Sequence, residues 1–437
     1  TKVENSLKPE KNYHYSPVNG LGEKITKISF PEGRFLRIQY YVLGANRYRD
    51  QEITITDSKD KRIGRVLSLA VPDESGEATH LYFFHYQINS DQSGYTDVVP
   101  KGGRKIRYHY GKELRIHAIE FFTLNQQAQE VKSHTHAFFW GKKGTVDEGN
   151  LLGKFSLDSK GNYVKGTSFV YEKGNVTTEI LLGNLSGRRP DALKVITNRD
   201  LPNAGHPKPG NEWYRKYYTY DAKHRLVKQW EDNESSREFT YWKESNLVHT
   251  ELFKSKGLCK RKVNNYDANT CLIETLEDDG FGKHQDITRL TLSKSLESYG
   301  KPQKVERFFC QDSSSTELSL GKEEFAYDEK GNVVFQQFFD SDGKFIYSLS
   351  NKFDSFSQLT QQTDSRGPKL LFTYDKNGNV LSKQGPREAV LKKYTYDKNN
   401  FPSSEETSES NGKVWKDSFK NDLFGNKIQE TDPFGNQ

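Results

Sequence analysis

Two histidines in alternate positions have the spacing in this sequence that is best suited to chemistry. In an extended strand, His134 and His136 would present both imidazole rings on one face, a geometry that can bind a metal ion. No Cys, Asp or Glu stands at a spacing that would complete a ligand set. We therefore favour a polar strand that carries two histidines by chance, and we predict neither a metal site nor a cofactor.

Other reactive side chains are equally short of partners. Acidic runs occur in segments that we interpret as turns, where carboxylates usually accept hydrogen bonds from backbone amides, and further histidines lie in strand-like stretches that the sequence does not bring together. The cysteines are odd in number and lack the spacing of a zinc or redox motif, so we expect buried or free thiols. No nucleophile elbow, phosphate loop or Cys-His motif is present. We expect no catalytic residue and no enzyme, and the sequence leaves the binding residues unknown. The groups concerned are Asp57-Ser58-Lys59-Asp60, Glu277-Asp278-Asp279-Gly280, His80, His85, His109, His117, Cys259, Cys271 and Cys310.

A repeated phrase of an aromatic residue, a spacer, Tyr and Asp points to the elements that organise the chain. Two aromatics at positions i and i+2 lie on one face of a strand, and the flanking residues have high β preference. Repeats of this kind indicate a repeat architecture. The clear copies are Tyr218-Thr219-Tyr220-Asp221, Phe325-Ala326-Tyr327-Asp328, Phe372-Thr373-Tyr374-Asp375 and Tyr394-Thr395-Tyr396-Asp397.

The residues after the Tyr predict a hairpin turn. Asp is favoured at the first position of a type I turn, and a glycine with φ > 0 then returns the chain into the next strand as a three-residue hairpin with a bulge. Tyr171-Glu172-Lys173-Gly174 is a looser copy with a shorter turn. The predicted structural positions are Tyr220, Asp221, Tyr327, Asp328, Gly331, Tyr374, Asp375, Gly378, Tyr396 and Asp397.

A second group of turns, rich in Pro, Gly and Asp, alternates with the first. One complete unit reads turn, strand, Tyr-Asp turn and strand, from Asp364 to Val380. The steps from Tyr327 to Phe353, Tyr374 and Tyr396 are 26, 21 and 22 residues, the length of a hairpin. Turns of the second group, and degenerate copies of the first, are Phe30-Pro31-Glu32-Gly33-Arg34, Pro100-Lys101-Gly102-Gly103-Arg104, Asp340-Ser341-Asp342-Gly343-Lys344, Asp432-Pro433-Phe434-Gly435-Asn436, Phe239-Thr240-Tyr241, Tyr266-Asp267-Ala268-Asn269 and Lys352-Phe353-Asp354.

With these motifs the chain resembles the RHS/YD-repeat family, which includes bacterial polymorphic toxins, the cocoon subunits of insecticidal toxin complexes and teneurins. The resemblance implies an all-β fold of hairpins wound into a spiralling antiparallel sheet, a shell or part of one. It is strong over residues 165–437, the predicted regular repeat region, and weaker over residues 1–164, a predicted RHS-like region with irregular repeats. The last residues, 431–437, end at a turn that should lead into another strand, so we expect a fragment or one piece of a larger assembly. We find no self-cleavage segment and do not expect autoproteolysis.

Composition agrees with a thin wall. Only 33% of the 437 residues are hydrophobic, yet 24 Tyr and 27 Phe argue against disorder. A Tyr-rich β-sandwich or propeller is the alternative, although propeller repeats are nearer 40–45 residues. The 65 basic and 59 acidic residues are interleaved, which is not a nucleic-acid footprint, and no apolar run of about 20 residues predicts a membrane span.

The resemblance implies a structural function. The first expectation is the encapsulation shell of a secreted or cell-surface bacterial toxin, with a toxic cargo domain in cis or as a separate chain, and with other shell or delivery components as further partners. The alternative is an interaction module that uses exposed Tyr and Phe to bind protein or glycan.

Overall fold

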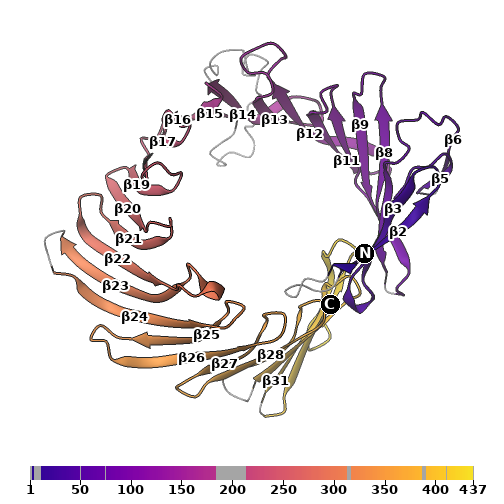
Figure 1. Cartoon of the computed structure of the whole chain (residues 1–437). Coiled ribbons are helices and arrows are strands. Elements are labelled where there is room, and N and C mark those ends of the chain that lie inside the picture. Colours follow the sequence, from indigo (N-terminus) through magenta and orange to yellow (C-terminus); the bar gives the residue numbers. More distant parts are fainter. Residues whose placement is uncertain are drawn as a thin grey trace. The chain divides into compact units, whose positions relative to one another are not determined.

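The computed structural model describes residues 2–3, 11–49, 51–73, 75–183, 213–312, 316–385, 390–409 and 411–436. Nearly all of these residues lie in antiparallel strands or in the turns between them (Figure 1). The helices in the described part are two 3-10 turns, Pro31–Gly33 and Leu296–Ser298. The expectation of an all-β, antiparallel chain is confirmed.

The chain divides into two compact units. Unit 1 comprises Thr1–Phe84, Thr291–Glu306 and Leu320–Gln437, and unit 2 comprises His85–Leu290 and Arg307–Ser319. The predicted boundary between residues 164 and 165 falls inside strand β14 (Tyr163–Glu172) and stays a prediction.

The strands that lie wholly or mainly in unit 1 are β1 (Lys2–Val3), β2 (Lys11–Val18), β3 (Gly22–Ser29), β4 (Phe35–Tyr40), β5 (Gly44–Tyr48), β6 (Gln51–Ile55), β7 (Val66–Pro72), β8 (Ala78–Ile88), β24 (Leu318–Tyr327), β25 (Val333–Phe339), β26 (Phe345–Phe353), β27 (Leu359–Asp364), β28 (Lys369–Tyr374), β29 (Val380–Gln384), β30 (Val390–Tyr396), β31 (Pro402–Glu409), β32 (Val414–Asn421) and β33 (Lys427–Thr431). Those of unit 2 are β9 (Gly94–Pro100), β10 (Ile106–Tyr110), β11 (Ile116–Leu124), β12 (Glu130–Trp140), β13 (Leu151–Leu157), β14, β15 (Asn175–Gly183), β16 (Trp213–Tyr220), β17 (Leu226–Glu231), β18 (Ser236–Tyr241), β19 (Val248–Ser255), β20 (Leu258–Tyr266), β21 (Leu272–Asp278) and β22 (Lys283–Leu292). Strand β23 (Pro302–Asp312) has residues in both units.

Strands pair with their neighbours in the chain, as a series of hairpins requires. In unit 2 the antiparallel pairings run in chain order from β9 to β22, and in unit 1 they run from β24 to β33. Among the described residues, 31 strands belong to one sheet, and β5 and β6 form a separate two-stranded sheet. Strand β4 therefore pairs with β7 and skips the β5–β6 hairpin.

One hydrophobic cluster of unit 2 is built on two buried side chains. They are Phe155, exposed to only 2%, and Leu182, exposed to 1%, with partly buried side chains packed around them. Those surrounding side chains are Phe139, Leu157, Tyr163 and Ile180. Gly166 lies opposite Phe155 on the neighbouring strand, so the aromatic ring covers the glycine.

In unit 1, the first strands contact the last repeats. The rings of Tyr82 on β8 and Phe424 in the β32–β33 turn meet edge to face with centroids 5.5 Å apart. The ammonium of Lys398, in the β30–β31 turn, lies 3.1 Å from where a Cβ on Gly76 would stand. The unit therefore joins segments from both ends of the sequence.

Candidate functional site

Each repeat tyrosine is the last residue of its strand and forms a hydrogen bond to an earlier strand of the sheet. Their hydroxyls donate to a backbone carbonyl at the start of a preceding strand, so that a carbonyl near the end of the ladder has a partner. A register shift precedes each Tyr, and burial raises the pKa of each hydroxyl. The hydrogen bonds run from Tyr220 to Val176 (2.9 Å), from Tyr327 to Pro302 (2.6 Å), from Tyr374 to Leu359 (2.8 Å) and from Tyr396 to Val380 (3.0 Å).

The repeat aspartates cap the turns, as predicted. Asp375 donates its backbone N–H to the carbonyl of Asn379 (3.0 Å) and accepts from the N–H of Gly378 (3.1 Å). Its Oδ1 accepts from the amides of Asn377 and Asn379, at 2.8 Å each. The carboxylates of Asp221, Asp328 and Asp397 accept two backbone amides in the same way.

The left-handed turn position does not always hold glycine. Gly331 and Gly378 have φ of 76° and 90°, as predicted, whereas His224 and Asn400 occupy the corresponding positions after Asp221 and Asp397 with φ of 61° and 72°. A search for glycine alone therefore misses half of these four turns.

The same turn also occurs outside the predicted repeat region. Asn125 accepts the amides of Gln127 and Gln129 through its side-chain oxygen, and Ala128 takes the left-handed position. Asn89 begins a turn with the same backbone hydrogen bonds, with Gln92 at φ 72°. Sequence reasoning missed these turns because Asn replaces Asp and no glycine follows. An Asp or Asn at hairpin intervals was the available signal.

Replacing Tyr396 by Phe is expected to destabilise the β29–β30 hairpin by about 1–2 kcal/mol, because the Val380 carbonyl loses its donor. Hydrogen exchange of the amides in β29 and β30 measures the change locally. Tyr394→Phe is the matched control on the same strand, since the Tyr394 hydroxyl has no hydrogen bond within the described residues. Equal protection in both variants would argue against a role for the hydroxyl.

Replacing Gly378 by Val is expected to cost about 2 kcal/mol in the β28–β29 hairpin, because a β-branched residue tolerates positive φ poorly. Gly378→Asn is the control and should cost less, since Asn400 occupies the equivalent position in the next Tyr-Asp turn. Thermal unfolding and local hydrogen exchange both report the difference. Unchanged stability in the Val variant would contradict the assigned turn.

Acid should weaken the β7–β8 turn through Asp73. A hydrogen bond from the Ser75 hydroxyl, helped by the Glu77 amide and the Thr79 hydroxyl, lowers the pKa of Asp73 from 3.8 to about 2. A lowered folded-state pKa stabilises the protein above the unfolded-state value, and this contribution is lost as the pH falls from about 4 to about 2. In Asp73→Asn the thermal midpoint should fall less over this range than in the wild type. If the thermal midpoints of the two proteins changed equally with pH, Asp73 would not contribute to the acid sensitivity.

The structure places His134 and His136 on one face of β12, as expected, but in a ring cluster. The His134 ring stacks on Phe121 with centroids 4.3 Å apart, and the two imidazoles meet edge to face at 5.4 Å. Burial, together with the charges of His134 and Lys165, lowers the pKa of His136. Among the described residues, no group of three or more His, Cys, Asp or Glu is placed to hold a metal ion. That the chain binds no metal stays a prediction.

The remaining candidates occupy structural positions. His109 contacts Glu120 (2.9 Å) across β10 and β11, and the rings of His80 and Phe83 lie 4.7 Å apart. Cys259, Cys271 and Cys310 form no disulfide with one another, as expected, and Cys310 is buried. Asp57 and Asp279 accept backbone amides in turns.

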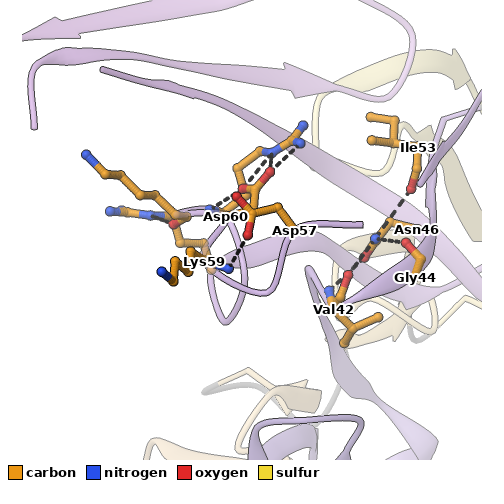
Figure 2. A network of polar contacts seen from close by, with 10 residues as sticks. Val42, Gly44, Asn46, Ile53, Asp57, Lys59 and Asp60 are labelled. Atoms are coloured by element: carbon orange, nitrogen blue, oxygen red, sulfur yellow. Dashed lines mark hydrogen bonds and ion pairs between the residues drawn. The ribbon is translucent and has the colours of Figure 1, made fainter. Parts of the chain in front are cut away.

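The excursion between β4 and β7, residues 41–65, was not recognised in the sequence. Backbone hydrogen bonds of 2.9 Å each join Tyr41 to Arg65 and Gly64 at its base. Asn46, exposed to only 4%, bonds backbone atoms of Val42, Gly44 and Ile53, so one amide side chain ties the start of the excursion to both of its strands (Figure 2).

A cavity of about 640 Å³ lies between this excursion and the sheet of unit 1. Its polar lining comes from strands β2, β3, β4 and β5 and includes His14, Lys27, Arg37, Gln39, Asn46 and Arg47. The Tyr-Asp repeats alone would not predict this open pocket, because the β5–β6 hairpin forms one of its sides.

No protein family model matches the sequence, and no curated protein matches it. Solved structures do match. A crystal structure of TcdB2-TccC3-TEV is 13% identical with a TM-score of 0.50, and the alignment covers 98% of this chain and 19% of that chain. The chain shares this fold.

Two further matches have lower scores. A crystal structure of TcdB2-TccC3-Cdc42 is 10% identical with a TM-score of 0.47, covering 98% of this chain and 26% of that one. A Photorhabdus luminescens Tc holotoxin pore is 11% identical with a TM-score of 0.40, over the same shares of the two chains. The chain thus spans about a fifth to a quarter of the length of these three structures.

Proposed function

We propose that the chain is a wall segment of an RHS-type shell in a secreted or cell-surface bacterial toxin, where it encloses a toxic cargo domain. The cargo would belong to the same polypeptide or to a separate chain, with other shell or delivery components as partners. The observation that carries this proposal is the fold shared with TcdB2-TccC3-TEV along 98% of the chain. RHS-repeat shells are the structural role that the sequence resemblance also implies.

The chemistry of the repeats supports a wall. An antiparallel sheet can expose one of its faces to water. In this chain, hydrogen bonds from tyrosine hydroxyls connect neighbouring strands and aspartate side chains cap the turns, so the sheet does not depend on a thick apolar core. Nearest-neighbour hairpin contacts then supply the stability, as in other repeat proteins. Within the described residues no helix is both long and apolar enough to cross a membrane. We also propose that the chain is not an enzyme, since its turn carboxylates are engaged with backbone amides. We propose that it does not bind nucleic acid, since its 65 basic and 59 acidic residues are interleaved.

Small-angle X-ray scattering tests whether the chain forms a thin wall or a filled globule. A filled globule of 437 residues would have a radius of gyration of about 22 Å. We expect a clearly larger value and a pair-distance distribution depleted at short range. A radius at the compact limit would contradict a wall and would favour an interaction module.

Protection from a protease tests whether the chain encloses a cargo domain. A candidate cargo domain, produced in the same polypeptide or as a separate chain, should co-purify with this chain and should resist trypsin only in its presence. A chain carrying Gly378→Val, with a weakened hairpin, is the matched control and should protect less. Equal digestion with and without the chain would overturn encapsulation.

The second candidate, a module that binds protein or glycan, is favoured by exposed apolar side chains on turns. Phe281 is exposed to 79% and Leu296 to 90%. Binding to a glycan array that Phe281→Ser abolishes, with no protected cargo, would put this function first.

A further inference from the structure

Three basic side chains stand in one row across the sheet of unit 1. His14 on β2 is directly opposite Lys27 on β3, and Lys27 is directly opposite Arg37 on β4. Directly opposed residues lie about 4.5–5.5 Å apart between Cβ atoms, and like charges in such pairs are destabilising. The fold therefore keeps an unfavourable arrangement at this place.

No acidic side chain relieves the row. The lining of the 640 Å³ cavity contains His14, Lys27, Arg37 and Arg47 but neither Asp nor Glu. In the described part of the chain none of these four side chains forms an ion pair with a carboxylate, whereas many other surface cations do, such as Lys392 with Glu405 (2.6 Å). The cavity thus presents the cations Lys27, Arg37 and Arg47 with no acidic residue in its lining, and Glu52, which is opposite Arg47 on β6, lies outside that lining.

Aromatic packing holds two of the cations in place. Lys27 Nζ lies 4.7 Å and the Arg37 guanidinium carbon 5.6 Å from the centroid of the Phe35 ring. Phe35 is exposed to only 8%, so the ring itself is fixed. His14 Nε2 contacts the Ser29 hydroxyl at 2.8 Å, which places the imidazole at the end of the row.

A further cation, Arg47, comes from the β5–β6 hairpin. Arg47 follows Asn46, whose side chain bonds the backbone at Val42, Gly44 and Ile53 (Figure 2). These contacts fix the hairpin backbone at the wall of the cavity. A rigid support of this kind is what a binding site needs and what a charge cluster on a loose loop lacks.

We propose that this cavity binds a small organic polyanion, with phosphate or clustered carboxylate groups, that neutralises the row. A volume of about 640 Å³ is in the range of small-molecule sites, about 300–1,000 Å³. Arg37 and Arg47 each offer a planar fork that suits a pair of anionic oxygens, and Lys27 adds a point charge. This site is independent of the shell function, because it depends on strands β2–β5 and not on cargo.

The test uses the whole chain with two probes, inorganic pyrophosphate and citrate. Isothermal titration at low ionic strength should show saturable one-to-one binding of at least one of them. Arg37→Gln should weaken this binding about tenfold or more, as expected for loss of a charge-assisted hydrogen bond. Lys24→Gln is the control, since Lys24 lies on β3, the strand of Lys27, but outside the cavity, and should leave the affinity unchanged.

Thermal unfolding supplies a second readout. Without anion, Arg37→Gln should raise the unfolding midpoint, because it removes one of the opposed like charges. With pyrophosphate or citrate the wild-type midpoint should rise, and that of Arg37→Gln should not. Preference for pyrophosphate would assign a phosphate ligand, and preference for citrate a carboxylate ligand. No saturable binding of either probe, or equal weakening by Lys24→Gln, would overturn the proposal.

Discussion

Phe155→Ala is expected to destabilise unit 2 by about 3–5 kcal/mol, the usual cost of deleting a buried phenyl ring. Phe155 is exposed to only 2%, and the rings of Phe139 and Tyr163 meet it edge to face at centroid distances of 5.6 and 5.7 Å. Leu182 is the other buried member of its cluster, and the side chains packed around the two are only partly buried. Hydrogen exchange across β12–β15 and the thermal midpoint measure the loss.

The glycine beneath the ring provides the control for this prediction. A Cβ on Gly166 would stand 2.1 Å from Phe155 Cδ1, so Gly166→Ala alone should cost about 1–3 kcal/mol through overpacking. In Phe155→Ala the same methyl group finds empty space, so the double variant should be less destabilised than the sum of the two single variants. Additive losses would mean that the ring does not cover the glycine.

Tyr41→Ala is expected to destabilise the N-terminal part of unit 1 by a similar amount, about 3–5 kcal/mol. Tyr41 is completely buried, its hydroxyl donates to the Phe84 carbonyl at 2.9 Å, and the Arg62 guanidinium lies 5.9 Å from its ring centroid. The side chain thus anchors the excursion of residues 41–65 to β8. Thermal unfolding and exchange in β4, β7 and β8 report the loss.

Two variants separate the contribution of the Tyr41 ring from that of the hydroxyl groups at positions 40 and 41. Tyr41→Phe keeps the ring and removes only the hydroxyl, so it should cost about 1–2 kcal/mol. Tyr40→Phe removes the neighbouring hydroxyl bond to the Ile25 carbonyl and should affect β3 and β4 but leave the excursion intact. A Tyr41→Ala protein with wild-type exchange in β7 and β8 would show that the excursion is held by its backbone alone.

The local hairpins could be predicted from the amino-acid sequence. Alternation of aromatics with polar residues specifies one face of a strand, and an Asp followed by a residue that accepts positive φ specifies the turn, because both depend on neighbours within a few positions. The predicted turns at Asp328 and Asp375, and the turn at Asp432, were therefore correct in detail. Turns at Asn89 and Asn125 were missed because Asn performs the same capping without the expected Asp-to-Gly spacing.

Strand register and long-range packing determine which side chains meet across the sheet. The contact of Tyr82 with Phe424 joins segments far apart in the chain, and the row of His14, Lys27 and Arg37 depends on the register of three strands. A shift of one residue would send each of these side chains to the opposite face of the sheet. Local preferences do not carry that information, so the hairpins were readable from the sequence and the cavity was not.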